Sequence, residues 1–295
     1  MTELIINESD LTSLNGKVVL ITGGSSGIGL ATTRILLSLG ASVVSGDINP
    51  PQGGFEDPSL TFQPTDVTKW SDLLALFKRA REVHDRIDHV FANAGVSIRA
   101  DYLATELDEN GDLKEPSFES VDVNLRGVIN TTTLAIYYMR PEQQSGGGGS
   151  VVITSSIASF MRFRAVDYAA AKHGNLGFMR GIRQILSYRK LPIRVNAIAP
   201  SYTRTGIVPE AIMDEMGVVM QEPEAAARTA LLLMADGSRH GQLIHSAEGK
   251  FKEIEDSLLV PVAHEIIGRD KPTEDDVLMR MLEMMHKEGV EIGSW

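Results

Sequence analysis

Short apolar runs alternate with helical segments along most of this chain, and this alternation restricts its possible folds more than any other feature. The run KVVLITGG (17–24) enters a group of glycines, and GIGLATTRILLSLG (27–40) follows with helical spacing and ends at a glycine suited to a C-cap. Further strands are predicted over 41–48, 88–95, 151–156, 193–200 and 241–249, and further helices over 69–87, 117–140, around 168–172 and over 222–236. Such alternation predicts an α/β fold with a Rossmann-type, doubly wound parallel sheet.

The chain is predicted to form a single domain that spans residues 1–295. Its 295 residues, of which 43% are hydrophobic, suffice for one large core, and no repeat or domain-length linker interrupts them. We place this core at about 14–250. From about 253 to 295 the chain is acidic and rich in methionine, and TEDDVLMRMLEMMHKEG (273–289) is predicted to be an amphipathic helix. These residues are expected to form a short C-terminal helical extension.

Charge and composition exclude several classes of protein. The net charge of −11 argues against a nucleic-acid partner, because phosphate binding needs a basic face. The absence of cysteine excludes disulfides and zinc–thiolate sites, and no two of the seven histidines have H-x-x-x-H spacing, so no metal is expected. The N-terminus lacks the features of a signal peptide, and no apolar run reaches the roughly 18 residues that span a bilayer. We therefore expect a cytoplasmic protein with no membrane partner.

The stretch TGGSSGIG (22–29) has the composition of a dinucleotide-binding loop. It lies between a predicted strand and a predicted helix, where glycines let the backbone approach a pyrophosphate at the positive end of the helix. The loop has no G-K-[ST] and is therefore not a P-loop, while a plain tight turn is the alternative. The predicted cofactor-binding residues of the loop are Thr22, Gly23, Ser25, Ser26, Gly27 and Gly29.

Asp47 ends the second predicted strand, 18 residues beyond Gly29. A carboxylate at this place accepts hydrogen bonds from the ribose hydroxyls of NAD and repels the additional phosphate of NADP. No arginine or lysine in the loop or directly after Asp47 offsets this repulsion. The sequence therefore favours NAD, although NADP stays possible if a basic residue folds in from elsewhere. An exposed loop acid is the alternative reading of Asp47.

The ordered set of motifs resembles that of the short-chain dehydrogenase/reductase family, in its compact single-domain branch and most like its fungal members. The resemblance covers roughly residues 14–250. The motifs are TGGSSGIG, TDVT (65–68), ANAG (92–95), VNLRG (123–127), SS (155–156), YAAAK (168–172) and IAPSYTRT (198–205). The resemblance implies an NAD(P)-dependent oxidoreductase that interconverts a secondary alcohol and a ketone of a small metabolite, and the likeness to fungal members suggests secondary metabolism. It also implies a homodimer or homotetramer.

The resemblance implies further cofactor contacts. Asp66 and Val67 would hold the adenine, Asn93 and Gly95 would flank the adenosine ribose, and Ile28 would lie against the pyrophosphate. The remaining implied contacts are Arg126, on the cofactor side, and Thr203 and Thr205, at the carboxamide of the nicotinamide. By the same resemblance, Asn124 would hold a water that links Lys172 to solvent.

Tyr168 and Lys172 are four residues apart, which places both on one face of a helix. Alone, such a pair is usually a surface or packing feature, but beside the other motifs it is predicted to be catalytic. Because a free tyrosine has a pKa of about 10, the ammonium of Lys172 is expected to lower the pKa of Tyr168 so that it exchanges the proton of the alcohol. The resemblance adds that Lys172 binds the nicotinamide ribose.

A serine hydroxyl is expected to hold the substrate oxygen. The sequence SIAS after the strand points to Ser156, whereas the usual family distance to the tyrosine points to Ser155; we choose Ser156. Arg162 and Arg164 either attract an anionic or carbonyl-rich substrate or are solvated surface charges. Residues 206–221 are expected to close over the substrate. The alternative functions are reduction of an imine or enone, isomerisation or dehydration, and dinucleotide sensing without catalysis.

Overall fold

The computed structural model describes residues 3–268 and 271–287, and these residues form one eight-stranded sheet. The strands lie in the order β3-β2-β1-β4-β5-β6-β7-β8; β1 to β7 are parallel, and β8 is antiparallel to β7. Their bounds are β1 (Val18–Thr22), β2 (Ser42–Asp47), β3 (Leu60–Pro64), β4 (His89–Ala92), β5 (Gly149–Thr154), β6 (Ile193–Pro200), β7 (Leu243–Ala247) and β8 (Lys250–Glu253). The strand order runs outward in both directions from β1 and β4. The predicted Rossmann-type, doubly wound sheet is thus confirmed.

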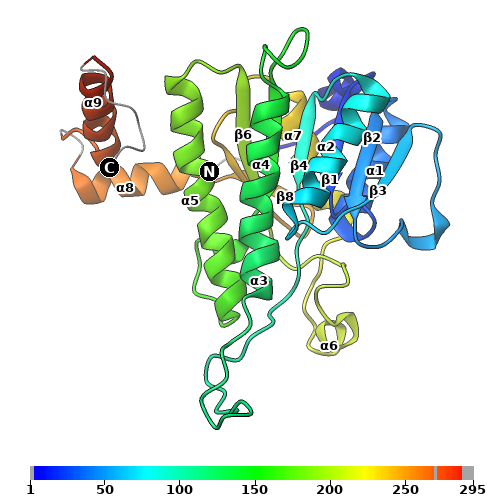
Figure 1. Cartoon of the computed structure of the whole chain (residues 1–295), viewed down its shortest axis with the longest axis vertical. Helices are drawn as coiled ribbons and strands as arrows, with labels where there is room; N and C mark the ends of the chain where they lie inside the picture. Colours follow the sequence, from blue (N-terminus) through cyan, green and yellow to red (C-terminus); the bar gives the residue numbers. More distant parts are fainter. Residues whose placement is uncertain (1–2, 269–270, 288–295) are drawn as a thin grey trace.

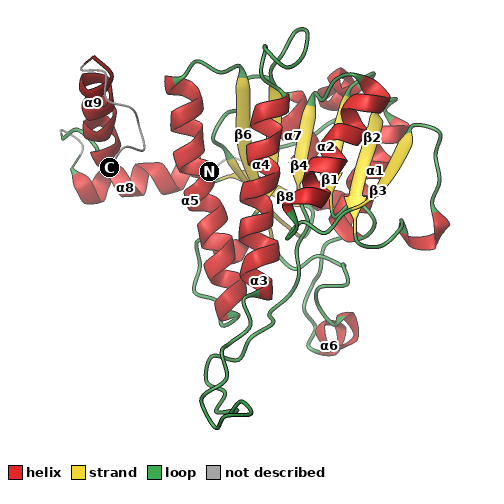
Figure 2. Cartoon of the chain, viewed as in Figure 1, coloured by secondary structure: helices red, strands yellow, loops and turns green. Residues whose placement is uncertain are grey.

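Helices cover both faces of the sheet. α2 (Trp70–His84), α4 (Gly127–Tyr138) and α5 (Val166–Tyr188) lie side by side on the face that is in front in Figures 1 and 2. α1 (Gly27–Ser38) and α7 (Pro223–Ala235) pack together on the other face. Further helical elements include the 3-10 helix Glu8–Leu14, α3 (Glu119–Val121), α6 (Glu210–Glu215), α8 (Val260–Ile267) and α9 (Glu274–Lys287).

The burial of β1 explains its unbroken apolar sequence. Leu20 packs into the core beneath α2, α4 and α5, whereas Val19 and Ile21 pack into the core beneath α1 and α7. All three side chains are fully buried. Because successive residues of a strand point to opposite faces, a strand with helices on both faces needs apolar side chains at every position.

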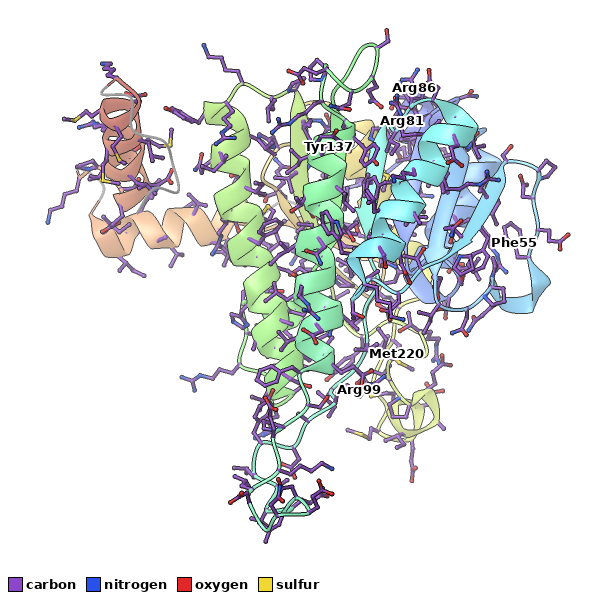
Figure 3. All side chains as sticks on the ribbon, viewed as in Figure 1. Phe55, Arg81, Arg86, Arg99, Tyr137 and Met220 are labelled. Atoms are coloured by element: carbon purple, nitrogen blue, oxygen red, sulfur yellow. The ribbon has the colours of Figure 1, made fainter. Side chains whose placement is uncertain are left out.

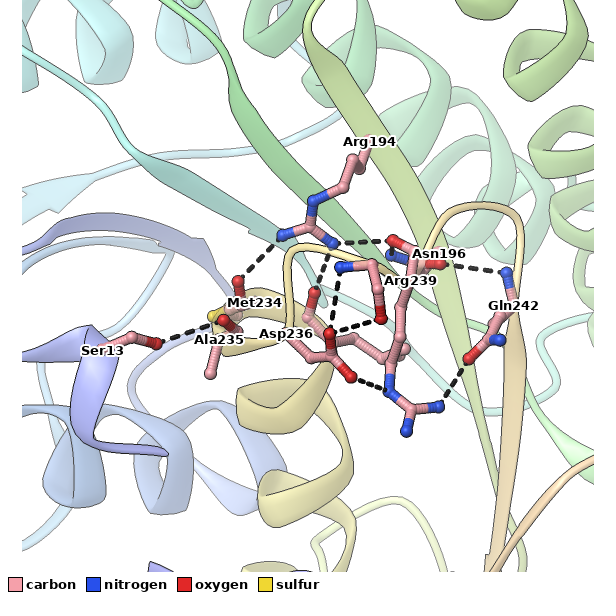
Figure 4. A network of polar contacts seen from close by, with 10 residues as sticks. Ser13, Arg194, Asn196, Met234, Ala235, Asp236, Arg239 and Gln242 are labelled. Carbon is pink, nitrogen blue, oxygen red and sulfur yellow. Dashed lines mark hydrogen bonds and ion pairs between the residues drawn. The ribbon is translucent and has the colours of Figure 1, made fainter. Parts of the chain in front are cut away.

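A polar network attaches the C-terminal end of α7 to β6 (Figure 4). Arg194 of β6 donates to the carbonyl oxygens of Leu233 at 3.0 Å and Met234 at 2.9 Å. The last carbonyls of a helix have no partner inside the helix and carry its negative end, so a guanidinium there both satisfies and stabilises them. Arg194 also donates to the carbonyl oxygen of Arg239 at 2.7 Å, in the loop that enters β7. One partly buried side chain therefore joins a helix, a strand and a loop.

The helix predicted over 117–140 is present with one irregularity. It begins as α3, continues through the π-helical turn Asp122–Arg126, and ends as α4. A π turn adds a residue to the helical repeat and is often found at functional sites. Asn124 lies inside this turn.

The two edge strands, β3 and β8, were not predicted. The residues of β3 are partly buried except for the exposed Pro64, and those of β8 alternate between exposed and partly buried, so neither segment has the apolar run of a central strand. β8 ends at Glu253, where the C-terminal extension was expected to begin. α8 and α9 follow it and lie to one side of the helices on the front face (Figure 1). The predicted helix over 273–289 agrees with α9 as far as residue 287; residues 288 and 289 lie outside the described part.

Two long loops leave the carboxyl ends of the strands. One connects β4 to α3, and the other connects β6 to α7 and contains α6. Both extend below the sheet in Figure 1. Ligands of doubly wound sheets bind at the carboxyl ends of the strands, so these loops are placed to border a site.

Candidate active site

A cavity of about 520 Å³ opens at the carboxyl ends of β1, β4, β5 and β6. It brings together residues from five of the seven predicted motifs. The predicted site residues that line it are Gly23, Ser26, Gly27, Ile28, Asn93, Gly95, Ser156, Tyr168, Lys172, Thr203 and Thr205. Cavities of this size accommodate small-molecule ligands and cofactors.

The glycine loop approaches neighbouring backbone so closely that side chains are excluded. Gly23 has a φ of +68°, and a Cβ there would lie 2.7 Å from Ala94 Cα. A Cβ on Gly29 would lie 1.9 Å from the carbonyl oxygen of Gly23. Ser26 occupies the N-cap of α1 without a side-chain cap, and the buried hydroxyl of Ser25 has no hydrogen-bond partner among the described residues. The positive end of α1 is therefore uncapped beside the cavity, which fits a pyrophosphate.

Asp47 is held beside the glycine loop. Its Oδ2 accepts a hydrogen bond from the backbone nitrogen of Ser25 at 3.1 Å, and its Oδ1 accepts one from that of Asn49 at 3.1 Å. Neither oxygen forms an ion pair with a lysine or arginine of the described residues. The carboxylate therefore keeps its negative charge uncompensated near the loop, where the ribose of a dinucleotide would lie.

Thr22 and Asn93 fix the loop to the sheet. The Thr22 hydroxyl accepts a hydrogen bond from the backbone nitrogen of Asn93 at 3.1 Å, and Thr22 itself is buried. The Asn93 amide donates to the carbonyl oxygen of Gly23 at 3.0 Å and accepts from the Thr154 hydroxyl at 2.9 Å. Thr22 thus supports the loop from below, whereas Asn93 also lines the cavity.

Several other predicted cofactor contacts lie outside this cavity. The hydroxyl of Thr68 donates to Asp66 and holds the pKa of that carboxyl below its usual value. Val67 is buried against the start of α4, where a Cβ on Gly127 would lie 2.8 Å from it. Arg126 has an exposed side chain that forms an ion pair with Asp122 at 3.1 Å. The structure does not bring Asp66, Val67 or Arg126 to the cavity that Tyr168 lines.

Tyr168 and Lys172 lie on the same face of α5, as the spacing predicted. Lys172 Nζ donates to the carbonyl oxygen of Thr154 at 2.7 Å and lies 5.5 Å from the centroid of the Tyr168 ring. Lys172 is buried, and this burial lowers its pKa from 10.5 to about 7 because an ammonium loses its hydration there.

The expected lowering of the Tyr168 pKa is wrong for the protein alone. Burial raises the pKa of Tyr168, since the phenolate would lose its hydration, and a hydrogen bond from Ser156 only partly opposes this effect. At neutral pH Lys172 is itself only about half protonated, given its pKa of about 7. The sequence could not show this, because the spacing of two residues does not report their burial.

The two neighbouring serines differ in orientation. Ser155 is fully buried, and its hydroxyl bonds to the hydroxyl of Ser159 at 2.5 Å and to the backbone carbonyl of Lys172 at 3.2 Å. The Ser156 hydroxyl accepts from the backbone nitrogen of Ala158 at 3.1 Å and interacts with the Tyr168 hydroxyl. Of the two hydroxyls, that of Ser156 is the one beside Tyr168.

Asn124 connects the π turn to the loop that follows β4. Its Oδ1 accepts from the backbone nitrogen of Val96 at 2.8 Å, and its Nδ2 donates to the carbonyl oxygen of Val96 at 2.9 Å. A Cβ on Gly95 would lie 2.9 Å from Asn124 Oδ1 and 3.9 Å from Lys172 Nζ. The Asn124 side chain is therefore close to Lys172 but is already used to hold the cavity wall.

The sequence motifs did not identify all of the residues that line the cavity. Arg162 and Arg164 are exposed and do not line the cavity. Arg99, from the loop after β4, does line it, together with Phe163 and Tyr202. No motif marks Arg99, because it lies in a loop of irregular sequence that only the fold brings beside α5.

Comparisons with known proteins identify the family. The short chain dehydrogenase family model matches residues 17–215, and the chain belongs to this family of oxidoreductases. It is 57% identical over 287 residues to short-chain dehydrogenase/reductase ascJ of Acremonium egyptiacum, covering 97% of both chains. It is 42% identical to short-chain dehydrogenase/reductase prx4 of Penicillium roqueforti, covering 75% of this chain and 64% of the relative. The resemblance to fungal members of the family is thus confirmed, and the protein is an enzyme.

A solved structure shows the same fold. The 3-ketoacyl-(acyl-carrier-protein) reductase of Brucella melitensis, solved in complex with NADH, has a TM-score of 0.66 and 23% sequence identity. The match covers 79% of this chain and 97% of that reductase.

In the described residues, no helix is long and apolar enough to cross a membrane, and no group of three or more histidine or acidic side chains is placed to hold a metal ion.

Proposed function

We propose that this enzyme is an NAD(P)-dependent oxidoreductase that interconverts a secondary alcohol and a ketone of a small organic metabolite. The observation that carries the proposal is the meeting of Tyr168, Ser156 and Lys172 in one cavity with the glycine loop. When bound, the nicotinamide accepts or supplies the hydride. The Brucella melitensis reductase, which is named for a ketone substrate and was solved with NADH, supports this chemistry by analogy of fold.

In this proposal each side chain has a separate role. Ser156 donates a hydrogen bond to the substrate oxygen and orients it. Tyr168 exchanges a proton with that oxygen through its hydroxyl. Lys172, beneath the Tyr168 ring, binds the nicotinamide ribose and supplies positive charge next to the hydroxyl when it is protonated. Asn124, whose side chain also bonds to the backbone of Val96, connects Lys172 to solvent through a water.

We propose NAD as the preferred cofactor, with the glycine loop around its pyrophosphate. The uncapped start of α1 and the unpartnered hydroxyl of Ser25 support the pyrophosphate position, and the uncompensated charge of Asp47 supports the choice of NAD over NADP. Parallel titrations with NADH and NADPH, followed by nicotinamide fluorescence, measure this preference. Tighter binding of NADPH would contradict the role of Asp47 but not the enzyme class.

The function is tested by Tyr168→Phe, with Tyr137→Phe as a matched control on the exposed side of α4. Turnover is measured with NADH or NAD and a panel of ketones and secondary alcohols. We expect Tyr168→Phe to lose about 10²–10⁴-fold in kcat while it still binds NADH, because only the proton-transfer group is removed. Full turnover by Tyr168→Phe would exclude this mechanism. If the wild type binds NADH but converts nothing, dinucleotide sensing becomes the better hypothesis.

The same assay separates the two serines. Ser156→Ala is expected to lower kcat, since its hydroxyl interacts with that of Tyr168. Ser155→Ala is expected to lower the free energy of unfolding instead, because its buried hydroxyl holds Ser159 and the backbone of α5. The opposite result would assign the substrate-binding hydroxyl to Ser155.

We also propose a domain organisation and an oligomeric state for the chain. A single domain with α8 and α9 as an extension agrees with the one continuous sheet of the described residues. We propose a cytoplasmic homodimer or homotetramer. Sedimentation or light scattering on the purified chain measures the oligomeric state, and a monomer at micromolar concentration would contradict it.

A further inference from the structure

Much of the cavity wall around Tyr168 is apolar, and it carries one charged side chain in addition to Lys172. Its wall contains a set of aliphatic and aromatic side chains: Ile98, Ile157, Phe163, Tyr202, Ile207 and Val208. Among the described lining residues, Arg99 and Lys172 are the charged ones, and no aspartate or glutamate is present. Lys172 is bonded to Thr154 beneath the tyrosine, so Arg99 is the cation available to the outer part of the cavity. Figure 3 shows Arg99 on the side to which the loops after β4 and β6 extend.

The backbone of Arg99 is hydrogen-bonded to a side chain at the start of α5. Its N–H donates to Asp167 Oδ2 at 2.8 Å, and Asp167 Oδ1 accepts from the N–H of Tyr168 at 2.8 Å. Asp167 is 1% exposed. One buried carboxylate thus holds two backbone N–H groups, one from the loop after β4 and one from the start of α5. The distance from Arg99 to Tyr168 is therefore set by the fold and does not depend on a free loop.

The guanidinium of Arg99 is only lightly engaged. Its Nε donates to Glu119 Oε1 at 3.0 Å, and the two side chains are 40% and 54% exposed. Its Nη1 makes a long contact of 3.5 Å with the carbonyl oxygen of Ile98. An exposed ion pair with one short contact contributes little stability, so an anion from the cavity can compete with Glu119 for the guanidinium. The planar group also has nitrogens left for a bidentate contact.

We propose, building on the function proposed above, that Arg99 binds an anionic oxygen of the substrate. The substrate is then a hydrophobic alcohol or ketone with a carboxylate or phenolate on the side remote from the reacting carbon. The apolar wall contacts its carbon skeleton, Tyr168 and Ser156 meet the reacting oxygen, and Arg99 fixes the opposite end. Asp167 holds the backbone of Arg99 next to the start of α5.

The test compares 4-acetylbenzoate with its methyl ester, since both carry the same ketone and only the first carries an anion. Binding of each to the enzyme–NADH complex is measured by nicotinamide fluorescence, and reduction is measured by NADH consumption. For the wild type we expect tighter binding of the acid than of the ester. For Arg99→Gln we expect the acid-to-ester ratio of kcat/KM to fall about 10- to 100-fold, chiefly through KM, because a charge-assisted hydrogen bond is lost.

Three further variants separate recognition from structural damage. Arg99→Lys keeps the charge and is expected to restore part of the preference for the acid. Glu119→Gln removes the competing carboxylate and is expected to lower the KM of the acid about 2- to 3-fold, a gain that a damaged fold would not produce. Arg162→Gln, an exposed arginine outside the cavity, is the matched control and is expected to leave the ratio unchanged.

The outcomes distinguish this inference from the function on which it rests. If the acid binds the wild type more tightly than the ester, Arg99→Gln removes that preference, and neither ketone is reduced, the inference holds and the proposed reaction is wrong. If both ketones are reduced with equal kcat/KM, the reaction stands and the inference is wrong. Equal losses for acid and ester in Arg99→Gln, or no binding of either ligand to the wild type, also overturn it.

Discussion

Replacing Lys172 with methionine should change how the stability of the cofactor-free protein depends on pH. Lys172 is buried, and its pKa is lowered from 10.5 to about 7. Between these two values the unfolded chain binds a proton at this lysine that the folded protein does not bind. The free energy of unfolding of the wild type therefore rises with pH above 7, and this contribution is lost as the pH falls back through 7.

The size of the effect follows from the shift. Each pH unit inside the window contributes about 1.4 kcal/mol, so the wild type should gain about 2.7 kcal/mol from this group between pH 6 and pH 9. Lys172→Met has no such group and should lack that gain. At pH 6 the variant also avoids the burial of an ammonium, although the carbonyl of Thr154 loses its 2.7 Å hydrogen bond.

Urea unfolding of both proteins at pH 6, 7, 8 and 9 measures the difference. Lys78→Met, a substitution of an exposed lysine on α2, serves as the control and should follow the wild type at every pH. A stability difference between the wild type and Lys172→Met that stays constant over this range would show that Lys172 keeps an ordinary pKa in the folded protein. The proposed link between its burial and its charge would then be wrong.

Three other substitutions test individual contacts in the glycine loop, at Asp47 and in a buried ion pair. Gly29→Ala should abolish NADH binding and lower the Tm, because the new Cβ would lie 1.9 Å from the carbonyl oxygen of Gly23; retained binding measured by fluorescence would contradict the close approach. Asp47→Ser should weaken NADH binding and raise the ratio of NADPH to NADH affinity, since the repelling charge is removed; an unchanged ratio in paired titrations would refute this. Arg180→Ala should lower the free energy of unfolding by about 3 kcal/mol, because it leaves the buried carboxylate of Glu255 without its 2.6 Å partner; equal urea midpoints would refute the loss, and adding Glu255→Gln should recover part of it.

Burial also changes the charges of Tyr168 and Lys172 in the cofactor-free cavity. Burial raises the pKa of Tyr168 and lowers that of Lys172, so around neutral pH the pair carries less charge than its sequence implies. A ligand that brings positive charge next to the Tyr168 hydroxyl would favour the phenolate. Without a ligand, burial therefore moves the pKa of Tyr168 further from neutrality and leaves Lys172 with less positive charge to offset a phenolate.

The helix α5 shows how much local spacing can predict. Tyr168 and Lys172 are four positions apart, and a helix has 3.6 residues per turn, so their common face follows from the sequence alone. The same holds for the glycine loop and for Asp47, because a strand followed by glycines and a helix is itself a local pattern. The alternation of apolar runs and helices likewise predicted the doubly wound sheet.

The edge strands, the choice of serine and the position of Arg99 depend on contacts between residues that are far apart in the sequence. The edge strands β3 and β8 exist because a neighbouring strand offers free hydrogen-bonding groups, and their own sequences lack the apolar runs of central strands. The choice between the Ser155 and Ser156 hydroxyls depends on which of them the chain turns toward Tyr168 at the end of β5. Arg99 meets the start of α5 across 68 residues of sequence. Sequence periodicity fixes which side chains share a face, whereas burial, pKa and the partner of each polar group depend on what the fold packs against that face.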